Sequence, residues 1–127
     1  MEDHLYQYFI IDHAKNPRNA GVLEHANAQT ELLNPSCGDM IQLYLIIEGT
    51  HVKEVRFQAK GCVISQAAAS LLSEQVKGKT RASLELLSAE DMVALLKISL
   101  GPTRLRCALL SLEALKMALT NYGKTDA

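Results

Sequence analysis

Four side chains of this 127-residue sequence are suited to hold a metal or to carry sulfur, and they are Cys37, Asp39, Cys62 and Cys107. A cysteine thiolate binds soft metals and attacks sulfur atoms, and three thiolates with one carboxylate match the ligand number of a tetrahedral zinc site or an iron–sulfur cluster. Asp39 lies two residues after Cys37, so both side chains point the same way if this segment is extended. The spacing leaves a metal site and three buried core cysteines as open alternatives, because no Cys-x-x-Cys pair is present.

The composition fits one domain spanning residues 1–127 and argues against several classes of protein. A net charge of −1 gives no basic field for nucleic acid or for an anionic membrane. No apolar run approaches the ~20 residues of a membrane-spanning helix, and residues 1–4 lack the pattern of a signal peptide. Three widely separated cysteines do not make a disulfide framework. We therefore expect a cytoplasmic protein that binds neither nucleic acid nor membrane.

Periodic apolar patterns predict the elements that would carry the four site residues. Helices are expected over residues 2–14, 62–77 and 103–121, and from a Ser88 N-cap through about Lys97. Strands are expected over residues 27–33, 40–48 and 53–60, with Gly49-Thr50 as a hairpin turn between the last two. Helices separated from a small antiparallel sheet with one solvated face indicate an α+β fold.

Each cysteine falls at a predicted element boundary, where side chains from different elements can converge. Cys37 lies in the turn before the second strand, Cys62 lies where the third strand becomes a helix, and Cys107 lies in the first turns of the last helix. A helix N-terminus and nearby cations both favour a thiolate. Cys62 would have the first influence, and Cys107 would have the second from Arg104 and Arg106.

Several short motifs follow one another along the chain. They are Ile11-Asp12-His13, Asn16-Pro17-Arg18-Asn19, Cys37-Gly38-Asp39, Arg56-Phe57, Gly61-Cys62, Ile64-Ser65, Ala69-Ser70, Val76-Lys77-Gly78-Lys79 and Arg106-Cys107-Ala108. In these motifs the sequence resembles the IscU/SufU/NifU N-terminal domain family of iron–sulfur cluster assembly proteins, over nearly its full length. The resemblance implies a SufE/NifU-like α+β fold, in which a three-stranded antiparallel sheet packs against about five helices.

The resemblance also implies a function and a role for each residue of the site. Cys37, Cys62 and Cys107 are similar to the family's thiolate ligands, and Asp39 is similar to its fourth, exchangeable ligand. Sulfur would arrive as persulfide from a cysteine desulfurase, with Cys107 as a candidate acceptor, and a transient [2Fe–2S] cluster would then pass to apo-proteins. Such a protein is a non-enzymatic scaffold, monomeric or homodimeric, and Zn2+ is an alternative occupant of the same site.

Two departures from the IscU type bear on the chemistry. IscU-type proteins have a histidine before the last cysteine, whereas this sequence has Arg106, which stays protonated and cannot bind a metal. A cation there could keep Cys107 as thiolate or stabilise an incoming persulfide, so Arg106 is a candidate functional residue. The segment Leu100-Gly101-Pro102-Thr103-Arg104 departs from the Leu-Pro-Pro-Val-Lys of IscU types, which gives little support for recognition by a dedicated Hsp70-type chaperone.

The sequence mixes features of two types within the family. Arg106 and Ile64-Ser65 are more similar to the SufU type, but only 44 residues separate Cys62 from Cys107, which is close to the IscU type. This mixture keeps an enzyme-like, zinc-dependent sulfurtransferase as an alternative to the scaffold. A structural zinc-binding protein is a second alternative.

The remaining polar residues are interpreted as structural. Ser65 and Ser70 are expected on a helix surface, and the leucine-rich last helix is expected to be core. The histidines are expected to be solvated or capping, with His13 ordering the Asn-Pro-Arg turn; they are His4, His13, His25 and His51. The basic run of Lys77, Lys79 and Arg81 is expected to be a solvated helix end.

Overall fold

The computed structural model describes residues 2–34 and 38–122, which form five helices and three strands. In chain order the elements are α1 (Glu2–Lys15), β1 (Ala28–Asn34), β2 (Asp39–Glu48), β3 (His51–Lys60), α2 (Val63–Val76), α3 (Arg81–Glu85), α4 (Ala89–Leu96) and α5 (Pro102–Asn121). The predicted α+β class is confirmed, and each element that the sequence located lies within two residues of its predicted bounds. None of the described helices is both long and apolar enough to cross a membrane.

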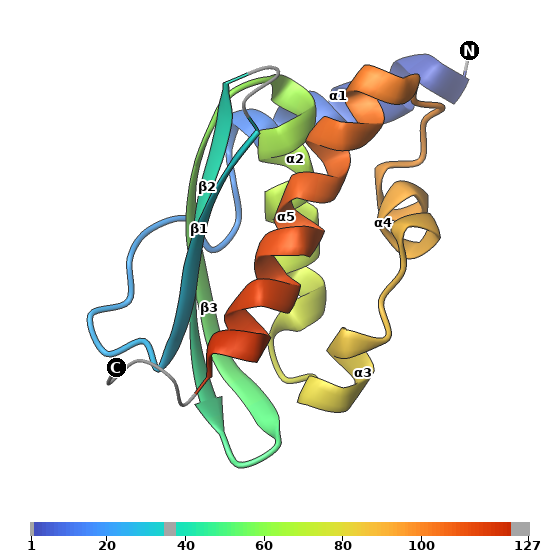
Figure 1. The fold of residues 1–127 in the computed structure, drawn as a ribbon. Coiled ribbons are helices and arrows are strands. Elements are labelled where there is room, and N and C mark those ends of the chain that lie inside the picture. The colour runs from blue at the N-terminus through green and yellow to red at the C-terminus, as the bar shows by residue number, and fades with distance from the viewer. Residues whose placement is uncertain (1, 35–37, 123–127) are drawn as a thin grey trace.

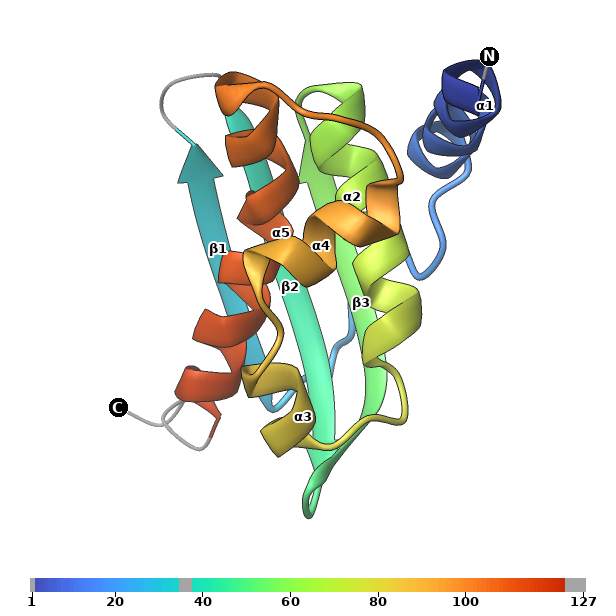
Figure 2. The same cartoon turned by 90° about the vertical axis from the view of Figure 1, so that its right-hand side faces the viewer.

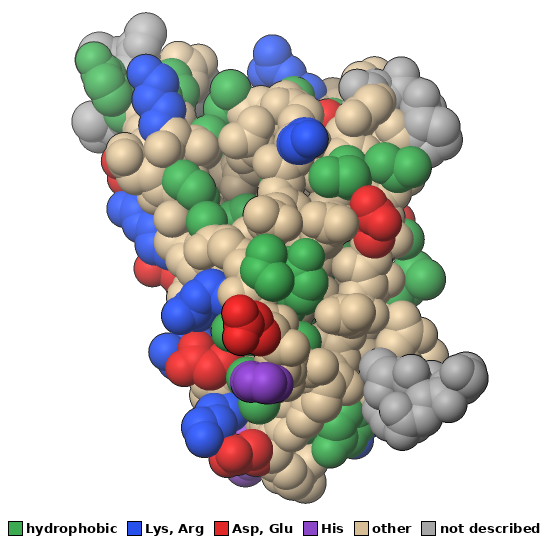
Figure 3. Space-filling model, turned by 90° about the vertical axis from the view of Figure 1, so that its left-hand side faces the viewer, with side chains coloured by type: hydrophobic (Ala, Val, Ile, Leu, Met, Phe, Trp, Pro, Cys, Tyr) green, Lys and Arg blue, Asp and Glu red, His purple; other side chains and the backbone are tan. Residues whose placement is uncertain are grey.

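The strands form one antiparallel sheet in the order β1-β2-β3, and helices cover one of its faces (Figure 1). α2 and α5 lie directly on the sheet, and α4 crosses them on the side away from the strands (Figure 2). α1 packs against α2, and α3 contacts α5. The opposite face is turned to solvent, with charged side chains gathered along one side of it and hydrophobic ones scattered between uncharged groups (Figure 3).

β2 follows the alternation that its sequence predicts. Ile41, Leu43, Leu45 and Ile47 are all buried, while the residues between them are partly exposed. The two-residue turn that joins β2 to β3 contains Gly49, whose φ of 62° costs a glycine little. The predicted hairpin and its single solvated face are both confirmed.

A bulge changes the register between β2 and β3. Ile46 and Ile47 are neighbours in β2, but their partners in β3 are two residues apart, so Lys53 is the extra residue. Strict alternation would place Val52 and Val55 on opposite faces, yet both are completely buried. The bulge therefore lets the end of the hairpin contribute two side chains to the core.

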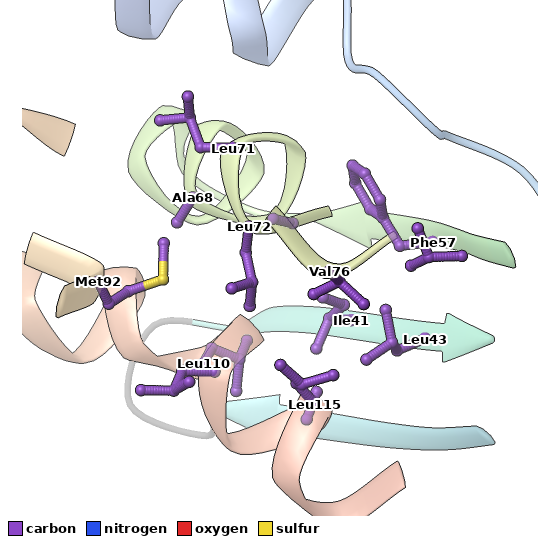
Figure 4. Close-up of a cluster of buried hydrophobic side chains, with 14 of the residues drawn as sticks. Ile41, Leu43, Phe57, Ala68, Leu71, Leu72, Val76, Met92, Leu110 and Leu115 are labelled. Atoms are coloured by element: carbon purple, nitrogen blue, oxygen red, sulfur yellow. The ribbon is translucent and has the colours of Figure 1, made fainter. Parts of the chain in front are cut away.

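The core lies between the sheet and the two helices that cover it. Leu72 and Val76 of α2 and Leu115 of α5 lie beside Ile41 and Leu43 of β2 (Figure 4), and each is at most 5% exposed. Burial of one such side chain is worth roughly 1.5–3 kcal/mol. The core role predicted for the last helix is confirmed. This packing holds α2 and α5 against the sheet, and two of the cysteines lie at or near the N-terminal ends of these helices.

The segment after α1 is held by polar and charged groups. Arg18 Nη2 lies 2.8 Å from Asp12 Oδ2, and Arg18 Nη1 donates to the Asn16 carbonyl at 2.9 Å. Asn16 Nδ2 donates to Asp12 Oδ1 at 3.1 Å. The hydrogen bonds that Asp12 accepts, from Arg18 foremost and then from Asn16, lower the pKa of its carboxyl group. They close the turn that the Asn-Pro-Arg sequence indicated.

The prediction that Ser70 lies on a helix surface is wrong, because Ser70 is completely buried in α2 where α1 packs against it. Its Oγ lies 2.7 Å from His13 Nδ1 and accepts the Arg18 backbone N–H at 2.9 Å. His13 is also buried rather than solvated, and burial is the main cause that lowers its pKa. Its predicted ordering of the turn fits this geometry, because Ser70 links His13 to Arg18.

The basic run after α2 is solvated only in part. Lys77 and Lys79 are exposed, but Arg81 is half-buried, opens α3 and places its guanidinium 4.7 Å from the centre of the Tyr122 ring. The solvated role predicted for Arg81 is therefore wrong. α3 has only five residues, which is too short for a helical period to be recognised in the sequence.

α4 begins with the N-cap that the sequence predicted. Ser88 Oγ accepts the Asp91 N–H at 3.2 Å, and the Asp91 carboxylate accepts the Ser88 N–H at 2.9 Å. The hydrogen bond from the Ser88 backbone is the main cause that lowers the pKa of Asp91. The two bonds form a capping box and fix the first turn of the helix.

Candidate metal and sulfur site

The structure brings three of the four predicted site residues to one place. The ligand atoms of Asp39, Cys62 and Cys107 lie within 4.8 Å of one another, although they come from β2, the start of α2, and α5. Cys37 lies outside the described residues, so its place beside the other three stays a prediction. Two thiols and a carboxylate at this separation are a donor set that one metal ion could bridge.

Asp39 is buried at the start of β2 because the segment that packs against it, at Gly61, has no side chain to fill the space. Its side chain packs against Gly61, which follows β3 and has a φ of 134°. A Cβ on Gly61 would lie 2.6 Å from Asp39 Cγ and 2.9 Å from Asp39 Cα, closer than real Cβ contacts. The position therefore needs glycine both for its backbone conformation and for the space of the carboxylate.

Cys62 caps the N-terminus of α2 and ties it to Asp39. Its backbone N–H donates to Asp39 Oδ1 at 3.0 Å, and its Sγ accepts the Ser65 N–H at 3.4 Å and lies 3.7 Å from Asp39 Oδ2. Its predicted place between the third strand and the following helix is confirmed. Cys62 is the most exposed of the three grouped residues, whereas Asp39 and Cys107 are buried.

Ser65 belongs to this site, and the prediction that it lies on the helix surface is wrong. It is 4% exposed; its hydroxyl donates to Asp39 Oδ2 at 2.5 Å and lies 3.4 Å from Cys62 Sγ. Asp39 is 1% exposed, and a buried carboxylate needs such donors because it is shielded from water. The signal that could have placed Ser65 here is the Ile64-Ser65 motif, in which Ser65 lies three residues after the N-cap Cys62.

Cys107 is buried in the second turn of α5, and the two arginines near it in sequence are placed differently. A cavity of about 540 Å³ is lined by both Cys62 and Cys107 and, from the same face of α5, by Thr103 and Arg104. Arg106 is exposed and is not among the described residues that line this cavity. One residue along a helix turns the side chain by about 100°, whereas Arg104 lies nearly one turn before Cys107. The functional role of Arg106 remains a prediction.

The walls of the same cavity are mostly apolar. They include Ile10 and Ile11 of α1, Val63 and Ile64 of α2, and Ile98 after α4. Ile11 and Val63 are large hydrophobic side chains that stay 42% and 47% exposed. An apolar surface that reaches solvent thus lies beside two of the thiols. Exposed apolar patches are typical of protein–protein interaction sites and binding grooves.

The fold and the donor set together define a small α+β protein in which two thiols and a carboxylate share one site. The family described as NifU-like N terminal domain matches residues 5–127. The chain belongs to this family, which confirms the resemblance seen in the sequence motifs.

Individual relatives carry the names of both types seen in the sequence. The chain is 37% identical to the zinc-dependent sulfurtransferase SufU of Bacillus subtilis, over 90% of this chain and 88% of the relative. It is 32% identical to the iron-sulfur cluster assembly scaffold protein IscU 1 of Archaeoglobus fulgidus, over 96% and 82%. The crystal structure of FiSufU, from the SUF system of Fervidobacterium islandicum AW-1, matches with a TM-score of 0.79 and 31% identity, over 94% of this chain and 99% of that one.

Proposed function

We propose that this protein is an iron–sulfur cluster assembly scaffold. It accepts persulfide sulfur from a cysteine desulfurase, builds a transient [2Fe–2S] cluster and transfers the cluster to apo-proteins. The observation that carries the proposal is the convergence of Asp39, Cys62 and Cys107 within 4.8 Å beside an apolar-walled cavity. Membership of the NifU-like family and the likeness to an IscU scaffold protein support it.

Sulfur acceptance requires a thiolate within reach of the donor's persulfide. A thiolate of this chain attacks the outer sulfur, a new S–S bond forms, the donor's S–S bond breaks, and the donor cysteine leaves as a thiolate. This exchange involves no net oxidation. Cys107 is the candidate acceptor, and Cys62 lines the same cavity beside it. Conversion of the transferred sulfur to sulfide takes two further electrons from an external reductant.

The donor set suits a cargo that has to be released. Thiolates are the usual ligands of iron in iron–sulfur clusters, and Cys37, Cys62 and Cys107 would supply three of them. Asp39 would supply a harder oxygen ligand, which holds iron less tightly than a fourth thiolate would. Three sulfurs and one oxygen also fit tetrahedral zinc, so zinc competes for the same residues.

Anaerobic reconstitution with ferrous iron, cysteine, a desulfurase and a thiol reductant tests this proposal. We expect a cluster that absorbs visible light and moves to an apo-ferredoxin, and we expect Cys62→Ser and Cys107→Ser variants to retain little of it. Ser73→Ala serves as the control, because Ser73 is a buried α2 serine that bonds to Arg18 and Asn19 rather than to the site. The proposal fails if zinc stays bound, no cluster forms and nothing reaches the acceptor.

A zinc-dependent sulfurtransferase is the second candidate. The SufU relative, 37% identical, carries that name, and Arg106 stands where IscU types have a histidine. In this function zinc would be held by the same residues, and one cysteine would leave zinc to take the sulfur. Zinc loading should then raise desulfurase turnover in the absence of iron. Unchanged conversion of cysteine to alanine on addition of the zinc-loaded protein excludes this candidate.

A further inference from the structure

Ser65 contacts two of the grouped side chains through two different donors. Its hydroxyl donates to Asp39 Oδ2 at 2.5 Å, and its backbone N–H donates to Cys62 Sγ at 3.4 Å. From these contacts we propose that Ser65 is a positioning residue, which holds the Asp39 carboxylate in the orientation that binds the metal. The inference rests on the proposed function, because it takes Asp39, Cys62 and Cys107 as the residues that hold zinc or cluster iron.

These donors matter because metal binding requires three negatively charged ligands close together. In the thiolate form that binds a metal, Cys62 and Cys107 lie with the Asp39 carboxylate within 4.8 Å of one another, and these charges repel until the cation is bound. Asp39 is 1% exposed, so water screens this repulsion poorly. The Cys62 N–H and the Ser65 hydroxyl each neutralise part of the carboxylate's charge, on Oδ1 and Oδ2 respectively. Without the hydroxyl, one oxygen loses a donor and the carboxylate is held less firmly beside the sulfurs.

The hydroxyl of Ser65 is not needed to build α2. Alanine forms helices better than serine does, and the Ser65 N–H that caps onto Cys62 belongs to the backbone and survives the substitution. A Ser65→Ala variant should therefore fold with α2 intact. Its defect should appear in the metal site, which separates a positioning role from a structural one.

Competition between the protein and a chromophoric chelator for zinc measures this defect. We expect Ser65→Ala to lower zinc affinity 10–100-fold, the usual result of removing a hydrogen bond to a metal ligand. Ser73→Ala, the matched substitution in the same helix, should stay within about twofold of wild type. In an Asp39→Ala background, Ser65→Ala should add no further loss, because the hydroxyl acts through that carboxylate.

Two results overturn the inference. An unchanged zinc affinity in Ser65→Ala shows that the hydroxyl is not needed, and an equal loss in the wild-type and Asp39→Ala backgrounds shows that it does not act through Asp39. Failure of the proposed function is seen separately in the wild-type protein. If that protein binds neither zinc nor a reconstituted cluster, the function fails before any variant is compared, and the inference about Ser65 falls with it.

Discussion

Gly61 leaves Asp39 the space that a side chain would fill. An added Cβ would lie 2.6 Å from the carboxylate carbon, so no residue but glycine can stand there unless Asp39 moves. The same carboxylate accepts the Cys62 N–H at 3.0 Å, and Cys62 caps α2. Gly61 therefore allows the Asp39 carboxylate to be buried. Through its hydrogen bond with Cys62, the carboxylate then connects the sheet to the start of α2.

Gly61→Ala should lower the zinc affinity by more than its loss of folding stability alone explains. The φ of 134° makes any L side chain strained, at a cost of order 1–3 kcal/mol in the free energy of unfolding. In addition, the new methyl group should push Asp39 away from the thiols and lower zinc affinity at least tenfold. Chemical denaturation measures the first effect, and chelator competition measures the second.

Gly21→Ala is the matched control for this variant. Gly21 has a φ of 130°, and the one contact that a Cβ there would make with the described residues is with Arg56 Cδ, at 4.0 Å. It should therefore lose stability through the same backbone strain while keeping its zinc affinity. Equal losses of affinity in the two variants would mean that Gly61 acts through general destabilisation and not through the space it leaves for Asp39.

Stability should depend on pH through His13. Burial is the main cause that lowers its pKa below 6.5, the nearby Arg18 charge adds to this, and Glu74 opposes it. The unfolded chain therefore binds a proton at higher pH than the folded protein does. The free energy of unfolding should be constant above about pH 7.5 and should fall as pH drops through 6.5 toward the lowered pKa. Urea denaturation at pH 8, 7, 6 and 5 measures this slope.

Substitution of His13 should remove that slope. His13→Asn keeps a polar group near Ser70 but does not titrate. The variant should be less stable than wild type at pH 8, and its free energy of unfolding should be nearly independent of pH between 7 and 5. His25→Asn is the control, because His25 is exposed and its replacement should leave the wild-type slope in place. Asp12 and Asp91 have a lowered pKa and lose their contributions only in more acidic solution. A wild-type slope in His13→Asn would assign the dependence to another group.

The sequence located the parts of this fold that depend on local pattern. Alternation identified the buried face of β2, and the change of period after Gly61 placed Cys62 between a strand and a helix. The burial of Ser65 and Ser70 could not be read in the same way, because serine is compatible with either side of a helix. Their burial depends on Asp39 and His13, which lie 26 and 57 residues away in the chain. Of the two arginines near Cys107, the sequence favoured Arg106, and only the placement of α5 shows that Arg104 is the one that lines the cavity.

Ser70→Ala should lower stability without affecting the metal site. The substitution removes the acceptor of the Arg18 N–H and the partner of His13 Nδ1, and polar groups left buried without a partner cost about 1–3 kcal/mol. Ser111→Ala is the control, since Ser111 is equally buried but its hydroxyl has no hydrogen-bond partner among the described residues. We expect that control to be neutral or stabilising in urea denaturation. A reduced zinc affinity in Ser70→Ala would contradict the view that the hydrogen bonds among Ser70, His13 and Arg18 are independent of the metal site.

Arg104 should support sulfur acceptance more than Arg106 does. Both side chains are exposed, but Arg104 lines the cavity that contains Cys62 and Cys107, whereas Arg106 does not. A cation at the cavity wall attracts an anionic persulfide, so Arg104→Ala should slow sulfur transfer from the desulfurase severalfold at low salt. This defect should shrink as added salt screens the charge. Arg106→Ala removes the same charge from a side chain outside the cavity lining and should slow the transfer less. Rates of persulfide transfer at two ionic strengths measure the ranking; the reverse order would return the role to Arg106, the residue that sequence comparison with IscU types had favoured.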